Sequence, residues 1–141
     1  MEQVDSGYTE LRSYQREMKH RLYEKWWGGS RSVMVQMPTG TGKTFLMAAV
    51  VRENAADGVL VVTHRIELVE QISETLSRFG VRHGVIAGGQ KALLAENVRV
   101  ASIQTLSRCI DSLSSCPSVV VVDEAHHALS LIHISEPTRP E

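Results

Sequence analysis

Five short runs rich in valine and isoleucine alternate with stretches of helical periodicity, and this alternation constrains the fold more than any other feature. The apolar runs span residues 32–37, 59–63, 81–87, 98–102 and 118–123. The helical stretches span residues 11–27, 43–55, 65–79 and 103–110. Short apolar strands joined by helical crossovers are typical of parallel sheets, whose two faces are both covered by helices. The sequence therefore predicts an α/β fold with a mostly parallel sheet flanked by helices.

Length and charge limit the class of protein. The 141 residues are one domain's worth. The net charge of -1 argues against a nucleic-acid binder that relies on overall positive charge, but it leaves a local basic groove open. No apolar run approaches the roughly 18–20 residues of a membrane span, and the polar start MEQVDSGYTE is not a secretory signal. Cys109 and Cys116 have no metal-ligand spacing, so we expect reduced thiols in a cytoplasmic protein.

The segment MPTGTGKT, residues 37–44, lies between a predicted strand and a predicted helix. Its glycines allow backbone N–H groups to approach phosphate oxygens, and the helix start adds partial positive charge. Lys43 would reach the β- and γ-phosphates, and the Thr44 hydroxyl would bind Mg²⁺. The strict phosphate-loop pattern has glycine where this chain has Met37, and an ordinary turn is the alternative. The candidate nucleotide-binding residues here are Thr39, Gly40, Thr41, Gly42, Lys43 and Thr44.

The segment VVDEAHHA, residues 121–128, follows the clearest strand. Ligands of parallel α/β sheets bind beyond the carboxyl ends of the strands. There Asp123 would hold Mg²⁺, and Glu124 would activate the attacking water. A solvated strand end is the alternative. The adjacent pair His126 and His127 does not fit a zinc site of the HEXXH type.

Together, MPTGTGKT and DEAH resemble the first motor domain of superfamily 2 helicases and translocases, the DEAD/DEAH-box-like ATPases. The resemblance covers residues 11–128. It implies a RecA-like P-loop NTPase fold, ATP and Mg²⁺ as cofactors, and Lys43, Asp123 and Glu124 as catalytic residues. In LRSYQREM (11–18), which resembles the adenine-recognition motif, Gln15 would hydrogen-bond adenine and Arg12 would pack on the base. A surface glutamine on an amphipathic helix is the alternative.

Two further segments, THRIELVEQ (63–71) and SIQTL (102–106), resemble the family's strand-contacting motifs. For the first segment, a helix cap followed by an exposed arginine is the alternative. The resemblance implies sequence-independent contacts to a nucleic-acid backbone. The form of LRSYQ and the DEAHH ending resemble the restriction-enzyme and repair-translocase branches, which favours DNA over RNA. The candidate contact residues are Thr63, Arg65, Gly88, Gln104 and Thr105.

The last thirteen residues, LSLIHISEPTRPE (129–141), depart from the pattern. They resemble the translation of a sequencing-library adapter read through in frame, and a genuine divergent tail is the alternative. We therefore expect three parts: residues 1–30 with the adenine-recognition motif, a C-terminally truncated RecA-like domain at 31–128, and a non-native tail. A sheet truncated in this way would leave an edge and an apolar face uncovered.

The predicted function is that of the ATP-binding motor domain of an ATP-dependent nucleic-acid helicase or translocase. The family's second RecA-like domain, which supplies arginine fingers, is missing from this chain, so we expect the chain alone not to unwind a duplex. One alternative is the motor part of a restriction or DNA-repair complex. Another is a nucleotide-binding or strand-binding module without turnover. No membrane association is expected.

Overall fold

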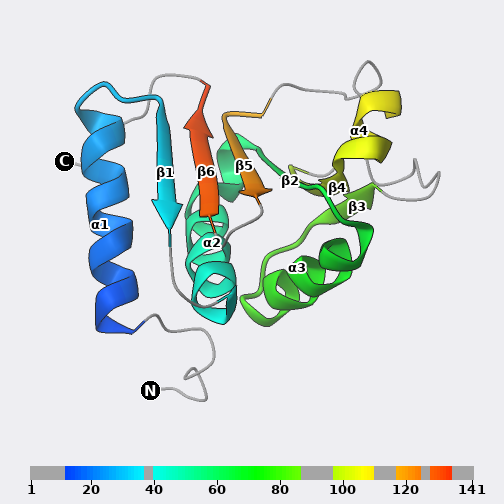
Figure 1. Cartoon of the computed structure of the whole chain (residues 1–141), viewed down its shortest axis with the longest axis horizontal. Coiled ribbons are helices and arrows are strands. Elements are labelled where there is room, and N and C mark those ends of the chain that lie inside the picture. The colour runs from blue at the N-terminus through cyan, green and yellow to red at the C-terminus, as the bar shows by residue number, and fades with distance from the viewer. Residues whose placement is uncertain (1–11, 37–39, 87–96, 110–116, 125–127, 135–141) are drawn as a thin grey trace.

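The computed structural model describes residues 12–36, 40–86, 97–109, 117–124 and 128–134, which form one mixed α/β sheet structure (Figure 1). The strands are β1 (Ser32–Gln36), β2 (Val59–Thr63), β3 (Gly84–Ile86), β4 (Val98–Ser102), β5 (Val119–Glu124) and β6 (Ala128–His133). The helices are α1 (Ser13–Trp27), α2 (Gly40–Asn54), α3 (Ile66–Arg78) and α4 (Ile103–Cys109), with the short 3₁₀ helix η2 (Ala55–Asp57) after α2. The predicted α/β fold is confirmed, and the mostly parallel sheet flanked by helices is consistent with a RecA-like domain.

The six strands lie in the order β1-β6-β5-β2-β4-β3. Strands β5, β2, β4 and β3 pair in parallel, whereas β6 runs antiparallel to both of its neighbours, β1 and β5. Only residues 125–127 separate β5 from β6. A parallel connection needs a crossover of about a dozen residues or more, so this short link permits only an antiparallel neighbour. The sheet is therefore mostly parallel, with one reversed strand between β1 and β5.

Strand β6 adds a sixth strand to the five that the earlier apolar runs predict, and it is formed by LSLIHI at the start of the last thirteen residues. Leu129 and Leu131 are fully buried in the core, and Ala128 pairs with both Gln36 and Glu124. The alternation in LSLIHI explains this placement, because every second side chain of a strand faces the same side of the sheet. Residues 135–141 lie outside the described part of the chain.

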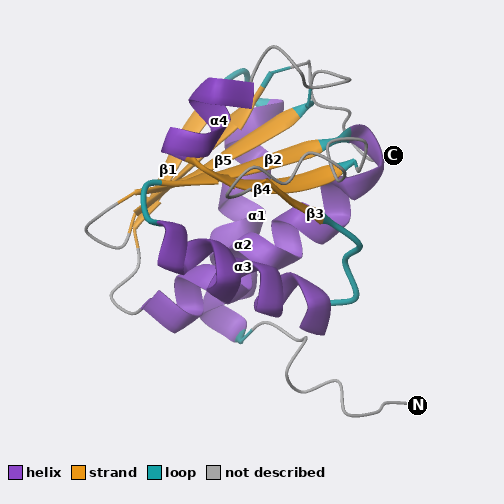
Figure 2. Ribbon diagram, turned by 90° about the vertical axis from the view of Figure 1, so that its right-hand side faces the viewer, coloured by secondary structure: helices purple, strands orange, loops and turns teal. Residues whose placement is uncertain are grey.

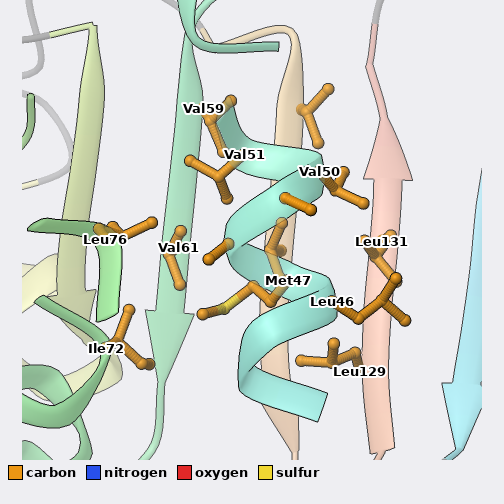
Figure 3. Packing of buried hydrophobic residues seen from close by; sticks show 14 of the residues in the cluster. Leu46, Met47, Val50, Val51, Val59, Val61, Ile72, Leu76, Leu129 and Leu131 are labelled. Carbon is orange, nitrogen blue, oxygen red and sulfur yellow. The ribbon is translucent and has the colours of Figure 1, made fainter. Parts of the chain in front are cut away.

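Helices α1, α2 and α3 cover one face of the sheet, and α4 lies on the other (Figure 2). The main core lies under α2, whose apolar side chains pack against the sheet and against neighbouring α3 (Figure 3). Fully burying one aliphatic side chain of this size contributes about 1.5–3 kcal/mol. The labelled members of this core are Leu46, Met47, Val50, Val51, Val59, Val61, Ile72, Leu76, Leu129 and Leu131.

The opposite face is only partly covered by the elements that the structure describes. Among the described elements, α4 contacts β2 and β4, and every residue of these two strands is buried. In contrast, Met34 on β1 is 62% exposed, and Val120, Val122 and Ile132 on β5 and β6 are half-buried. Within the described part of the chain, an open apolar face therefore lies over β1, β6 and β5.

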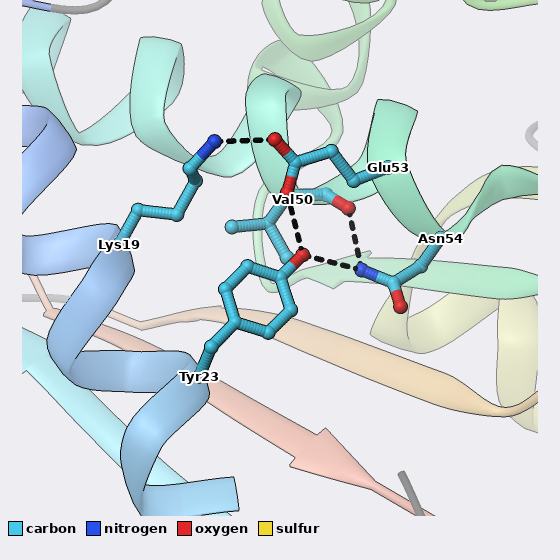
Figure 4. A network of polar contacts seen from close by, with 5 residues as sticks. All are labelled: Lys19, Tyr23, Val50, Glu53 and Asn54. Atoms are coloured by element: carbon cyan, nitrogen blue, oxygen red, sulfur yellow. Dashed lines mark hydrogen bonds and ion pairs between the residues drawn. The ribbon is translucent and has the colours of Figure 1, made fainter. Parts of the chain in front are cut away.

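A polar network joins α1 to α2 (Figure 4). The Tyr23 hydroxyl donates to Glu53 Oε1 at 2.8 Å and accepts from Asn54 Nδ2 at 2.9 Å. Glu53 also pairs with Lys19, and Asn54 donates to the Val50 carbonyl. Burial raises the pKa of Tyr23, and the neighbouring Glu53 carboxylate adds to this shift. The network holds α1 against the helix that follows β1. No helix in the described ranges is long and apolar enough to cross a membrane.

Candidate functional site

The predicted motifs meet at one edge of the sheet. Strands β2, β4 and β5 are parallel, and β1 runs the same way as β5 because both are antiparallel to β6. Thr63 at the end of β2 pairs with Ser102 of β4 and with Asp123 of β5. Helix α2 begins at Gly40, shortly after β1 ends. The carboxyl ends of these strands therefore form the kind of edge at which α/β proteins bind ligands.

Lys43 and Asp123 form a buried ion pair at this edge. The Lys43 Nζ atom donates to Asp123 Oδ1 at 2.6 Å, and the two side chains are 11% and 7% exposed. They lie 80 residues apart in sequence, so the tertiary structure alone brings them together. A buried lysine and a buried carboxylate each need such a partner, since an unpaired charge is costly away from water. The predicted lysine of the phosphate loop and the predicted metal ligand are thus direct neighbours.

The backbone before Lys43 is helical from Gly40 onward, three residues earlier than the sequence predicts. The first four N–H groups of an α-helix have no intrahelical acceptor, and the helix dipole places partial positive charge there. Helix α2 begins at Gly40, so Gly42 and Lys43 lie in its first turn, at its positive end. The Thr44 side chain, one residue further, is half-buried. Thr39 and the side chain of Thr41 lie outside the described part of the chain.

Glu124 is half-buried and accepts a hydrogen bond from the Ser130 hydroxyl of β6. Sequence reasoning missed Ser130 because it set aside the whole segment from residue 129. His64 was missed as well, and its Nδ1 atom lies 3.3 Å from the backbone oxygen of Asp123. The only sequence signal for His64 is its place inside THRIELVEQ. His126 and His127 lie outside the described residues.

Gln15 lies beside the start of α2 and not on the surface. Gln15 is only 4% exposed. Its Oε1 atom accepts from the Arg12 backbone N–H at 2.7 Å, and its Nε2 atom donates to the Gly42 carbonyl at 3.1 Å. The alternative of a surface glutamine is therefore wrong. Arg12 itself is exposed at the start of α1.

The candidate nucleic-acid residues differ in accessibility. Thr63 is fully buried, and its hydroxyl accepts a long hydrogen bond of 3.5 Å from the Arg65 backbone N–H. Arg65 is the exposed N-cap residue of α3, and the helix has no side-chain cap hydrogen bond. Arg65 is therefore accessible to a ligand, whereas the Thr63 side chain is not.

The segment after β4 is similar. The Ser102 hydroxyl accepts from the Thr105 backbone N–H at 3.2 Å, which caps the start of α4, and donates to the Thr105 hydroxyl at 3.0 Å. Gln104 is exposed, whereas Thr105 is half-buried. Among the candidate side chains, Arg65 and Gln104 are thus the two exposed ones at this edge. Gly88 lies outside the described residues.

A mostly parallel sheet whose edge pairs a helix-start lysine with a strand-end aspartate is consistent with a helicase-like ATP-binding domain. The family described as type III restriction enzyme, res subunit, matches residues 8–136, and the chain belongs to this family. The predicted resemblance is thereby confirmed. The matched range runs through β6. No curated protein matches the chain.

Proposed function

We propose that this chain is the ATP-binding motor domain of a nucleic-acid helicase or translocase that hydrolyses ATP with Mg²⁺. The observation that carries the proposal is the buried contact between Lys43 and Asp123. In a structural ion pair, neither group needs to lie at a helix start or a strand end. Here both do, at the edge where the phosphates of a bound nucleotide would lie.

Each residue at the edge has a role that its chemistry suits. Lys43 would exchange the Asp123 carboxylate for the β- and γ-phosphates. Backbone N–H groups from Gly40 to Lys43 would donate hydrogen bonds to the phosphate oxygens. The Thr44 hydroxyl and the Asp123 carboxylate are oxygen donors of the kind that Mg²⁺ prefers. Bound Mg²⁺ would neutralise charge on the phosphates. Glu124, oriented by the Ser130 hydroxyl, would accept a proton from the attacking water.

Gln15 and Arg12 would recognise the adenine ring. Arg12 is exposed and free to pack on a base. Gln15 would exchange its hydrogen bond from the Arg12 N–H for one from the adenine amino group, while its Nε2 atom stays on Gly42. Adenine binding by Gln15 would then be coupled to the phosphate-binding turn, because the same side chain is hydrogen-bonded to Gly42.

We further propose that the accessible Arg65 and Gln104, with backbone groups near Thr63, Thr105 and Gly88, hold the phosphates of a DNA strand. DNA is favoured over RNA by the family's description as a restriction enzyme subunit. The same description favours the motor subunit of a restriction complex over that of a repair complex. Full-rate catalysis would also require arginines from a second RecA-like domain, which in related phosphoryl-transfer proteins are worth about 10³–10⁵ in rate, so we expect only slow phosphate release from this chain.

Substitutions at Lys43 and Glu124 test this proposal in the 141-residue chain. Binding of a fluorescent ATP analogue with Mg²⁺ should weaken at least about tenfold in Lys43→Ala, since one good charge-assisted contact is lost. Glu124→Gln should keep the affinity for ATP and slow phosphate release. The exposed Lys25→Ala and Glu74→Gln are matched controls and should behave as the wild type does.

Two results would overturn the proposal. If Lys43→Ala binds the analogue as tightly as the wild type, the turn at residues 40–44 does not hold phosphates. If the wild type and Glu124→Gln retain ATP equally and neither releases phosphate, the module without turnover is the better description. Duplex unwinding by this chain, abolished in Lys43→Ala, would contradict the need for a second domain.

A further inference from the structure

The turn after β2 lies between the two parts of the candidate site. In the sheet, β2 is flanked on one side by β5, which carries Asp123 and Glu124, and on the other by β4, which leads into α4 and Gln104. After β2 the chain continues through His64 into Arg65, the exposed N-cap residue of α3. The acidic residues proposed to act on the nucleotide therefore adjoin this turn on one side, and a residue proposed to contact nucleic acid adjoins it on the other.

His64 connects this turn to the acidic end of β5. Its Nδ1 atom lies 3.3 Å from the backbone oxygen of Asp123. A carbonyl oxygen can only accept, so Nδ1 is the donor, and in the neutral ring the hydrogen is on Nδ1 and not on Nε2. The register of β2 with β5 ends at the pair Thr63 and Asp123. The imidazole therefore extends the contact between the two strands beyond their backbone pairing.

The Asp123 carbonyl is part of the peptide unit that joins the two acidic residues. The carbonyl of Asp123 and the N–H of Glu124 lie in one rigid plane. A hydrogen bond to the oxygen therefore restrains the orientation of that plane. The Asp123 side chain is held by Lys43, and the Glu124 side chain by the Ser130 hydroxyl. His64 thus holds the backbone between two side chains that each have a partner of their own.

The other end of the turn is anchored by α3. The Arg65 backbone N–H donates to the Thr63 hydroxyl at 3.5 Å, and the Arg65 carbonyl accepts from the Leu68 N–H at 3.1 Å. Because the helix is fixed in the core, a movement of Arg65 toward a bound phosphate would change the turn that contains His64. The core residues that fix the helix are Val69, Ile72 and Leu76.

We infer that His64 is a positioning residue that couples the binding of a nucleic-acid strand at Arg65 to the orientation of Asp123 and Glu124. The inference rests on the proposed function, since it requires ATP beside Lys43 and a strand beside Arg65. A strand that orders the turn would also order the hydrogen bond to Asp123, which holds this carboxylate in place for Mg²⁺. Coupling between two ligands is reciprocal, so each should tighten the binding of the other by the same factor.

Equilibrium binding to the 141-residue chain measures this coupling. The Kd of a fluorescent ATP analogue with Mg²⁺ is determined with and without a saturating short oligothymidylate, and the reverse titration gives the same factor independently. In the wild type we expect a factor of about three or more, the size of one neutral hydrogen bond. His64→Ala should reduce the factor to about one. His20→Ala, on the exposed part of α1, is the control and should couple as the wild type does.

Two conservative variants separate positioning by Nδ1 from a general effect of losing the ring. The side-chain amide of asparagine reaches about as far as Nδ1 of histidine, whereas that of glutamine reaches about as far as Nε2. His64→Asn should therefore keep most of the coupling, and His64→Gln should lose it. The ¹⁵N signals of the His64 imidazole should also show the hydrogen on Nδ1 in the neutral ring. His64 is exposed, so these substitutions should leave the fold intact.

The inference is overturned if the wild type binds both ligands without coupling, if His64→Ala keeps the full factor, or if His64→Gln preserves it as well as His64→Asn does. These results would leave the proposal for Lys43 and Asp123 intact. If the wild type does not bind the ATP analogue, the proposed function fails and the inference fails with it. If only the oligothymidylate does not bind, the nucleic-acid contact at Arg65 and the coupling both fail.

Discussion

At the scale of single residues, the ion pair between Lys43 and Asp123 decides how the candidate site is built. Both side chains are almost completely buried. In the described part of the chain, neither of them has a second ion-pair partner. Ion pairs of this kind contribute little net stability, but removing one partner leaves a charge buried without compensation.

We therefore predict that Lys43→Met and Asp123→Leu each lower the free energy of unfolding by about 3–5 kcal/mol. The double variant Lys43→Met/Asp123→Leu should recover most of this loss, since no charge is then left buried. Urea unfolding of the four proteins gives the coupling energy as a double-mutant cycle. Single losses below about 1 kcal/mol, the range of a surface pair, would show that the pair is open to water.

At the scale of elements, the contact between α1 and α2 places the adenine-recognition candidate next to the phosphate-binding turn. Tyr23, Glu53 and Asn54 connect the middle of α1 to the end of α2, and Gln15 reaches the Gly42 carbonyl from the first turn of α1. Removing the hydrogen bonds of Tyr23 should therefore weaken the packing of α1 against α2 without altering the residues at the edge of the sheet.

Tyr23→Phe should lower the free energy of unfolding by about 0.5–1.5 kcal/mol, because Glu53 and Asn54 each lose a hydrogen-bond partner. The raised pKa of Tyr23 adds a pH dependence. The folded state holds the phenolic proton more tightly than the unfolded state, so this stability is present below the ordinary tyrosine pKa near 10 and falls as the pH rises above it. Tyr23→Phe should lack that alkaline loss. The exposed Tyr14→Phe is the control, and an equal effect of both variants on stability would contradict the role of the network.

At the scale of the whole molecule, β6 closes the gap between β1 and β5. It is the strand through which the Lys43-bearing segment and the Asp123-bearing strand are held in one sheet. Trp26 of α1 also depends on it, because the indole Nε1 donates to the Leu131 carbonyl at 3.3 Å.

A chain that ends at His127 should therefore not fold cooperatively. It loses the buried Leu129 and Leu131, worth about 1.5–3 kcal/mol each, together with the pairing of two strands, out of a total stability of about 5–15 kcal/mol. The control is a chain ending at Ile134, which keeps β6 and should retain the fold. Circular dichroism during thermal unfolding compares the two, and a cooperative transition in the shorter chain would show that β6 is dispensable.

The open apolar face over β1, β6 and β5 should drive self-association. Exposed apolar sheet surface next to an edge strand is a common cause of aggregation. Met34→Lys should reduce concentration-dependent association in light scattering, because a lysine on the edge strand β1 opposes stacking and edge pairing. Tyr14→Lys, on a helix away from this face, should not reduce the association. If both variants reduced it equally, the added charge and not the apolar face would be the cause.

The sequence by itself determined the elements and the motifs. Strand and helix periodicity are local properties, so the positions of β1, β2, β4, β5 and the four helices were predictable to within a few residues. The turn before Lys43 and the acidic end of β5 could be assigned for the same reason, since both follow strands whose carboxyl ends must share an edge.

Only the tertiary structure decided which segments pair. The hexapeptide LSLIHI has the alternation of a strand, but nothing within it specifies a neighbour. Its place depends on β5, which directly precedes it, and on β1, whose residues lie about 100 positions earlier. The burial of Gln15 beside α2 and of Thr63 between β4 and β5 also depends on tertiary packing, as does the hydrogen bond from Ser130 to Glu124. Local periodicity is written in consecutive residues, whereas strand order and side-chain partners depend on which distant surfaces exclude water together.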